Sequence, residues 1–154
     1  MACEFTVTRQ VEFSDTDMAG IVHFSNFFRF MEGAEHAFFR SLGLSIHDGD
    51  SELGWPRVHA ECDFKQPLRF EDVIEIRLYV REKRKNRIVY GFIFQKLNEP
   101  ESGEIARGTV TVACVKREKS GRKMKSIPIP KSIADKITVG EGPAFLDRRP
   151  HRAR

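Results

Sequence analysis

The sequence predicts a two-layer α+β domain in which an antiparallel sheet curls around one long helix. Three observations predict it: one segment has the apolar period of a helix, one strand-like segment precedes it, and four strand-like segments follow it. Short polar connections join the last three strands, as in an antiparallel meander. A helix and a sheet bury their apolar faces by packing against each other, and 154 residues are enough for one such domain.

The first predicted strand is Phe5 to Phe13, where apolar residues mostly alternate with polar ones. From Asn26 to Leu42 the apolar residues recur at steps of three and four, which is one face of a helix. Ser25 is the expected N-cap and Gly43 the expected stop. The apolar arc is wide, which indicates a helix buried on most sides.

Four further strands follow the helix. They are expected at Trp55 to Phe64, Val73 to Val80, Ile88 to Leu97 and Ile105 to Val115. The polar turns EKRKNR and NEPESG separate the last three. The stretch SIPIPKSIADKI contains two prolines and is expected to add one short helix.

Composition restricts the class of protein. Apolar residues are 40% and charged residues 31%, which is enough to build a core and excludes wholesale disorder. The apolar runs are far shorter than the ~20 residues that span a bilayer, and the N-terminus has no signal-peptide pattern. The three cysteines are scattered, so we expect a reduced, cytoplasmic protein without a disulfide framework or a metal site.

The net charge of +4 comes from four arginines among the last seven residues, without which the chain is formally neutral. A basic tail can bind nucleic acid or an anionic surface, but a solvated end is the commoner case. We therefore expect one domain at residues 1–140, a flexible basic tail at 141–154, and no nucleic-acid partner.

The candidate catalytic residues lie in residues 11–28, the segment VEFSDTDMAGIVHFSNFF. Asp15 and Asp17 lie two apart in a turn that leads into the helix, whose first N–H groups point outward and carry partial positive charge. Such a site can polarise a carbonyl, and a nearby carboxylate can attack it or deprotonate a water. This combination suits acyl transfer to water. The spacing also fits two acidic residues that only cap the turn, which is the commoner role of such residues before a helix.

The same segment resembles the signature of the 4-hydroxybenzoyl-CoA thioesterase family of hotdog-fold acyl-CoA thioesterases. An aromatic and a small residue precede D-x-D-x-x-G-I-V, and an aromatic-containing stretch with an Asn leads into the long helix; here it is FSDTDMAGIVHFSN. GWPRVHAECDFKQPLRFEDVIEI is similar to the family's second strand, its proline-containing loop and the start of the next strand. The resemblance covers about residues 4–130.

The resemblance implies a hotdog fold, a long central helix wrapped by a curved antiparallel sheet, and hydrolysis of an acyl-CoA thioester to a carboxylic acid and CoA. It assigns Asp17 as nucleophile or general base and the backbone N–H of Phe24 as the donor to the thioester oxygen. Gly20 would let the backbone pass close to the substrate, and Asp15 would hold the turn.

The resemblance also implies substrate contacts. His23, Asn26 and Glu32 would lie near the acyl group, although His23 also fits a surface position and Glu32 a solvated helix residue. The CoA phosphates require cations. We assign the phosphate contacts to residues of the basic turns, although such turns also fit a solvated surface. The assigned residues are Arg84, Lys85, Lys123 and Lys125. The bulky apolar residues Phe27, Phe28, Phe30 and Met31 favour an aromatic or medium-length acyl group.

No metal or organic cofactor is implied, because CoA is part of the substrate. We expect a dimer or tetramer, since one helix leaves the second face and an edge of the sheet uncovered. Two other functions stay open: hydrolysis of an acyl-carrier-protein thioester, and a non-catalytic module that binds acyl-CoA or a protein. Asp17 argues against the second, because a binding module needs no carboxylate beside the carbonyl.

Overall fold

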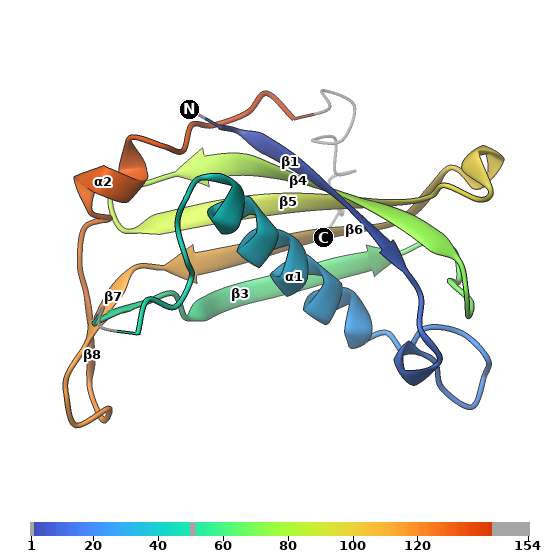
Figure 1. Cartoon of the computed structure of the whole chain (residues 1–154), viewed down its shortest axis with the longest axis horizontal. Helices are drawn as coiled ribbons and strands as arrows, with labels where there is room; N and C mark the ends of the chain where they lie inside the picture. Colours follow the sequence, from blue (N-terminus) through green and yellow to red (C-terminus); the bar gives the residue numbers. More distant parts are fainter. Residues whose placement is uncertain (1, 50–51, 143–154) are drawn as a thin grey trace, which may run out of the picture.

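The computed structural model describes residues 2–49 and 52–142, and it shows a long helix lying across one face of a curved antiparallel sheet (Figure 1). The strands of the main sheet are β1 (Glu4–Gln10), β3 (Arg57–Phe64), β4 (Val73–Lys83), β5 (Arg87–Lys96) and β6 (Glu104–Ala113). A small second sheet contains β2 (Leu53–Gly54), β7 (Val115–Arg117) and β8 (Met124–Ser126). The α-helices are α1 (Asn26–Ser41) and α2 (Lys131–Ala134). The α+β class predicted from the sequence is confirmed.

The long helix α1 packs its apolar stripe onto the sheet. Phe30, Met31 and Phe38 are at most 1% exposed. Met31 lies directly over Gly108 of β6, where any β-carbon would overlap the methionine side chain. The helix ends at Ser41, and Gly43 adopts a φ of 72°, which is the left-handed conformation that commonly ends helices. The predicted helix and its stop are therefore confirmed to within one residue.

The strand order is β1-β4-β5-β6-β3, and all neighbours are antiparallel. The meander β4-β5-β6 is confirmed. The structure adds that β3 lies beyond β6, so β1 and β3 are the two edges of the sheet.

Several element boundaries differ from the predicted ones, and β4, for example, continues to Lys83, past the predicted end at Val80. The first strand ends at Gln10, and a 3-10 turn, η1 (Phe13–Asp15), follows it. The segment from Trp55 to Phe64 becomes a strand only at Arg57. The strand predicted to Val115 stops at Ala113, because the chain passes there into the second sheet. At the end of β1 the alternation of apolar residues continues to Val11 and Phe13, past the last residue that pairs with β4.

The main sheet has two ends with different neighbours. At the loop end, residues 11–24 are held by hydrogen bonds from Val11 N–H to the Asp72 carbonyl and from Val22 N–H to the Leu68 carbonyl. At the hairpin end lies the β4–β5 turn, whose Asn86 amide donates to the Ser126 hydroxyl of β8. The 11 residues of β4 separate the two ends, a span of roughly 35 Å at the usual rise of a strand. Figure 1 shows the loop end on the right and the hairpin end on the left.

The predicted tail at residues 141–154 lies outside the described residues from 143 onward. Within residues 2–49 and 52–142, no helix is long and apolar enough to cross a membrane.

Candidate active site

The loop before α1 presents Asp17 to solvent. A bridge between Thr16 and Val22 closes the loop, and Asp17 N–H donates to the Ile21 carbonyl at 3.0 Å. Gly20 supplies the turn with a φ of 76°, which is unfavourable for residues with a side chain. One Asp17 oxygen accepts the Ala19 N–H at 2.8 Å, while the other accepts no hydrogen bond from the described residues. The carboxylate is thus oriented and has a free oxygen for a reacting group.

Asp15 has the opposite environment. Its side chain is buried, accepts the Glu12 N–H at 2.9 Å and pairs with the Arg9 guanidinium at 3.4 Å. Its backbone carbonyl accepts both the His23 N–H and the side-chain amide of Asn26. These contacts join the loop to β1 and to the start of α1. The geometry therefore favours a structural role for Asp15, as the sequence predicted.

The start of α1 leaves one backbone donor unused. From Val22 to Phe28, every backbone N–H except that of Phe24 has an acceptor among the described residues. Ser25 occupies the N-cap position, but its side chain does not cap the helix and instead contacts His23 Nδ1 at 2.7 Å. The free Phe24 N–H lies at the positive end of the helix dipole, so it can bind a carbonyl oxygen or an oxyanion.

His23 is attached to this helix start by its ring. The Ser25 backbone N–H donates to His23 Nδ1 at 3.3 Å, which makes Nδ1 an acceptor and places the proton of the neutral ring on Nε2. The ring stacks beside that of Phe24 at 4.6 Å. His23 thus contributes to the shape of the site, and no contact within the described residues links it to Asp17.

The structure brings some of the predicted site residues together and leaves others apart. Asp17, Gly20, His23, Phe24 and Asn26 all lie at the loop end, with the Asn26 amide directed to the Asp15 carbonyl. Glu32 is half-exposed, near His36 and Arg57. The predicted phosphate-binding residues lie at the hairpin end, on the β4–β5 turn and on β8 and the turn before it: Arg84, Lys85, Lys123 and Lys125. Within one chain, this cluster is therefore remote from Asp17.

The sequence did not predict a buried ion pair beside the helix. Glu35 is 1% exposed, and its Oε2 accepts a hydrogen bond from Arg57 Nη2 at 3.2 Å. Burial raises the pKa of Glu35 to about 7, against the effect of Arg57, and the neighbouring Glu32 raises it further. The one signal in the sequence was an acidic residue within the second apolar stripe of the helix, between Phe28 and Phe39.

Glu35 is expected to make stability depend on pH. Its folded-state pKa is above its ordinary value of 4.5, so the folded protein holds a proton that the unfolded chain has released. The free energy of unfolding should therefore fall as pH rises from about 4.5 to 7, by at most about 3 kcal/mol. Urea unfolding of wild type and Glu35→Gln at pH 5 and pH 8, at one protein concentration, should show a smaller pH difference in the variant. Equal pH differences would contradict this assignment.

Comparisons with known proteins match most of the chain. The thioesterase-like superfamily matches residues 11–137. A 1,4-dihydroxy-2-naphthoyl-CoA hydrolase from Prochlorococcus marinus (strain NATL1A) is 30% identical over 122 residues, which are 73% of this chain and 81% of that protein. A gentisyl-coenzyme A thioesterase structure has a TM-score of 0.73 and 32% identity, over 84% of this chain and 99% of that one. A 1,4-dihydroxy-2-naphthoyl-CoA thioesterase from Synechocystis has a TM-score of 0.78 and 24% identity, over 86% and 94% of the two chains, which shows the shared fold.

Proposed function

Since the chain belongs to the thioesterase-like superfamily of hotdog-fold thioester hydrolases, we propose that it hydrolyses an acyl-CoA thioester through Asp17 and the backbone N–H of Phe24. The family resemblance carried by residues 13–26 is confirmed by these comparisons, and the enzyme class follows from it. The catalytic residues and the CoA thioester as substrate are the proposal.

The observation that carries the proposal is that one loop, the one leading into α1, holds both the free Phe24 N–H and the oriented Asp17 carboxylate. A thioester oxygen hydrogen-bonded to Phe24 N–H would be polarised, and negative charge that develops on it would be stabilised by the helix dipole. The Asp17 carboxylate would then add to the carbonyl carbon and expel CoA thiolate, and water would hydrolyse the resulting anhydride. Alternatively, Asp17 would take a proton from a water whose oxygen adds to the carbon. Both routes end in a carboxylic acid and CoA, and neither requires a metal or an organic cofactor.

An aromatic acyl group fits the site best. Phe24 is 61% exposed, and its ring lies 6.4 Å from that of Phe64, which is 48% exposed. The similar proteins named above are thioesterases of 1,4-dihydroxy-2-naphthoyl-CoA and gentisyl-CoA, which are aryl thioesters.

The proposal is tested by measuring thiol release over a panel of aryl and aliphatic acyl-CoAs and acyl-carrier-protein thioesters. Release from the aryl-CoAs supports it. Hydrolysis of carrier-protein thioesters alone would support the alternative substrate, and binding without thiol release would support the non-catalytic module.

Neutralising the basic cluster at the hairpin end should weaken CoA binding more than it slows the chemistry. We expect Lys85→Gln combined with Lys125→Gln to raise KM by about three- to tenfold with little change in kcat, because partly exposed charge-assisted contacts contribute modestly. Acyl-pantetheine thioesters lack the nucleotide and should be insensitive to the change. Lys131→Gln, in α2 at the hairpin end of the sheet (Figure 1), is a matched control. Equal effects on both kinds of thioester would assign the cluster to folding or assembly.

The basic cluster can contact the CoA of a substrate bound at the loop end only if the cluster belongs to a second copy of the chain. We propose that copies pair along β3, because β3 is an edge of the sheet with most of its residues exposed. Unpaired N–H and C=O groups of an edge strand form a template for another strand. Light scattering between 1 and 50 µM protein should give the mass of a dimer or a tetramer. A stable monomer over this range would contradict both the pairing and the shared phosphate site.

A further inference from the structure

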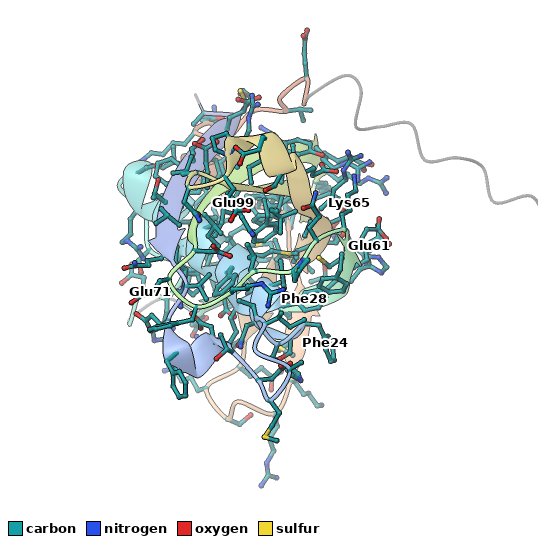
Figure 2. The ribbon with its side chains drawn as sticks, turned by 90° about the vertical axis from the view of Figure 1, so that its right-hand side faces the viewer. Phe24, Phe28, Glu61, Lys65, Glu71 and Glu99 are labelled. Atoms are coloured by element: carbon teal, nitrogen blue, oxygen red, sulfur yellow. The ribbon has the colours of Figure 1, made fainter. Side chains whose placement is uncertain are left out.

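The carbonyl oxygen of Asp15 joins the two ends of the loop that leads into α1. It accepts the backbone N–H of His23 at 3.0 Å and the side-chain Nδ2 of Asn26 at 2.8 Å. Asp17 lies two residues after this carbonyl, and Phe24 directly follows His23. The Asp17 carboxylate and the Phe24 N–H are therefore carried by two short stretches of backbone that meet at one oxygen atom. Figure 2 views the molecule from this end, with Phe24 labelled beside the start of the helix.

The protein occupies both polar ends of the Asn26 side chain, which is buried. Its Nδ2 donates to the Asp15 carbonyl, and its Oδ1 accepts a hydrogen bond from Arg29 Nη1 at 3.4 Å. A carbonyl oxygen only accepts and a guanidinium only donates, so a single orientation of the amide satisfies both partners. An ionised Asp of the same shape could accept from Arg29 but would have no donor for the Asp15 carbonyl.

The other hydrogen bonds of the loop do not replace this link to the helix. The bridge between Thr16 and Val22 and the bond from Asp17 N–H to the Ile21 carbonyl close the turn on itself. Among the residues that the structure describes, Asn26 is the one residue of α1 whose side chain donates a hydrogen bond to the loop. The amide therefore fixes the turn that carries Asp17 against the first residue of the helix.

We propose that Asn26 is a positioning residue, whose amide sets the place of the Phe24 N–H relative to the Asp17 carboxylate. This inference rests on the proposed function and adds one residue to the same site. The family resemblance implied that Asn26 lies near the acyl group. The inference assigns it no contact with the substrate, because both ends of its amide are bonded to protein. A displacement of about 1 Å at a reacting group can lower a rate about 100-fold, so the reaction should depend on this one bond.

The test uses Asn26→Ala and Asn26→Asp in the full chain. Asn26→Ala removes the amide. Asn26→Asp keeps its shape and adds a negative charge to the first turn of α1, which is favourable for a helix, but it cannot donate to the Asp15 carbonyl. Both variants should lose about 10- to 100-fold in kcat per folded molecule. The Kd of benzyl-CoA, a thioether without a carbonyl, should stay within a few fold.

Asn98→Ala is the matched control. Asn98 follows β5 at the loop end of the sheet, where its amide donates to the Asp72 carboxylate and its side-chain oxygen accepts the Val73 N–H, each at 3.0 Å. The same substitution thus removes a comparable pair of hydrogen bonds, neither of which reaches the loop that leads into α1. Calorimetry should show a lower Tm for Asn98→Ala, and its kcat measured well below that Tm should equal that of wild type.

The carbonyl stretch of a bound thioester reports the position of the Phe24 N–H directly. In Asp17→Asn, which should bind a thioester without turnover, a hydrogen bond from Phe24 should shift the C=O band to lower frequency. Isotope-edited infrared spectra should show the band moving back to higher frequency when Asn26→Ala is added to Asp17→Asn. A residue that only stabilises the fold would leave the band in place, as Asn98→Ala should.

Several outcomes would overturn the inference and leave the proposed function standing. One is a normal kcat in folded Asn26→Ala and Asn26→Asp, and another is a loss of the folded state in both. A weaker affinity for benzyl-CoA, or a loss of kcat whose size depends on the acyl group, would make Asn26 a substrate contact instead. An equal loss of kcat in Asn98→Ala would assign the effect to stability. Failure of wild type to hydrolyse any acyl-CoA would overturn the proposed function and this inference with it.

Discussion

The Asp17→Asn variant is expected to lose about 10²–10⁴-fold in kcat while substrate affinity stays within a few fold. The substitution removes the charge that serves as nucleophile or base. It preserves the fold, because Asp17 is exposed and its one hydrogen bond, from the Ala19 N–H, can be accepted equally by the Asn side-chain oxygen. Binding should persist, because the Phe24 N–H at the helix start and the basic residues at the hairpin end are unchanged. Thiol release gives kcat, and equilibrium binding of the unreacted thioester gives the affinity.

The control for this prediction is the thermal unfolding of the same variant, which should match wild type closely. Near-normal turnover by a folded Asp17→Asn variant would remove Asp17 from the reaction. If Asp15→Asn were then folded and inactive, the roles of the two carboxylates would have been assigned the wrong way round.

Asp15→Asn is expected to destabilise the fold rather than to abolish turnover. The Asp15 carboxylate is 2% exposed, pairs with Arg9 and accepts the Glu12 N–H. An Asn side chain loses the charge and presents an NH₂ group to one of these two donors. The cost should be about 1–3 kcal/mol, and each kcal/mol lowers Tm by roughly 2–4 °C in a domain of this size.

Calorimetry of Asp15→Asn, Asp17→Asn and wild type at one concentration provides the comparison. The Arg9 guanidinium also lies 4.5 Å from the Phe30 ring centroid, so Asp15 orients a cation that packs on the helix. The loss should therefore extend beyond the loop to the packing of β1 against α1. An unchanged Tm for Asp15→Asn would show that Asp15 does not hold the turn.

Local sequence patterns were sufficient to predict the elements whose hydrogen bonds and turn residues lie within one short segment. The period of apolar residues identified α1 because its hydrogen bonds run within the segment and its stripe faces one sheet. Gly43 marked the end of α1 because a left-handed residue is a local requirement. The loop of Asp17 was predicted for the same reason: its turn, its glycine and the helix start are within ten residues of one another. The family resemblance also proposed Phe24 as the donor, which stays a prediction; the structure adds that the other backbone N–H groups from Val22 to Phe28 have acceptors among the described residues.

Contacts between distant segments could not be predicted in this way. The alternation of apolar residues in β3 is the same whether the strand is central or at the edge, so its place beyond β6 required the whole sheet. From the sequence alone, the turn at Arg84 and the loop at Asp17 are equally good candidates for contacting one substrate molecule. They are separated by the length of β4, which is set by tertiary structure.

By itself, the sequence determined the α+β class, the helix with its stop, the meander and the carboxylate loop, because each depends on periodicity or on turn chemistry within a short segment. Only the tertiary structure decided that Glu35 is buried, that Arg57 from β3 holds one of its oxygens, and that Tyr90 from β5 lies close enough to feel its charge, with no hydrogen-bond partner for its hydroxyl among the described residues. The physical reason is that burial and the lack of a hydrogen-bond partner depend on which segments meet in space, and those segments are more than twenty residues apart in the chain.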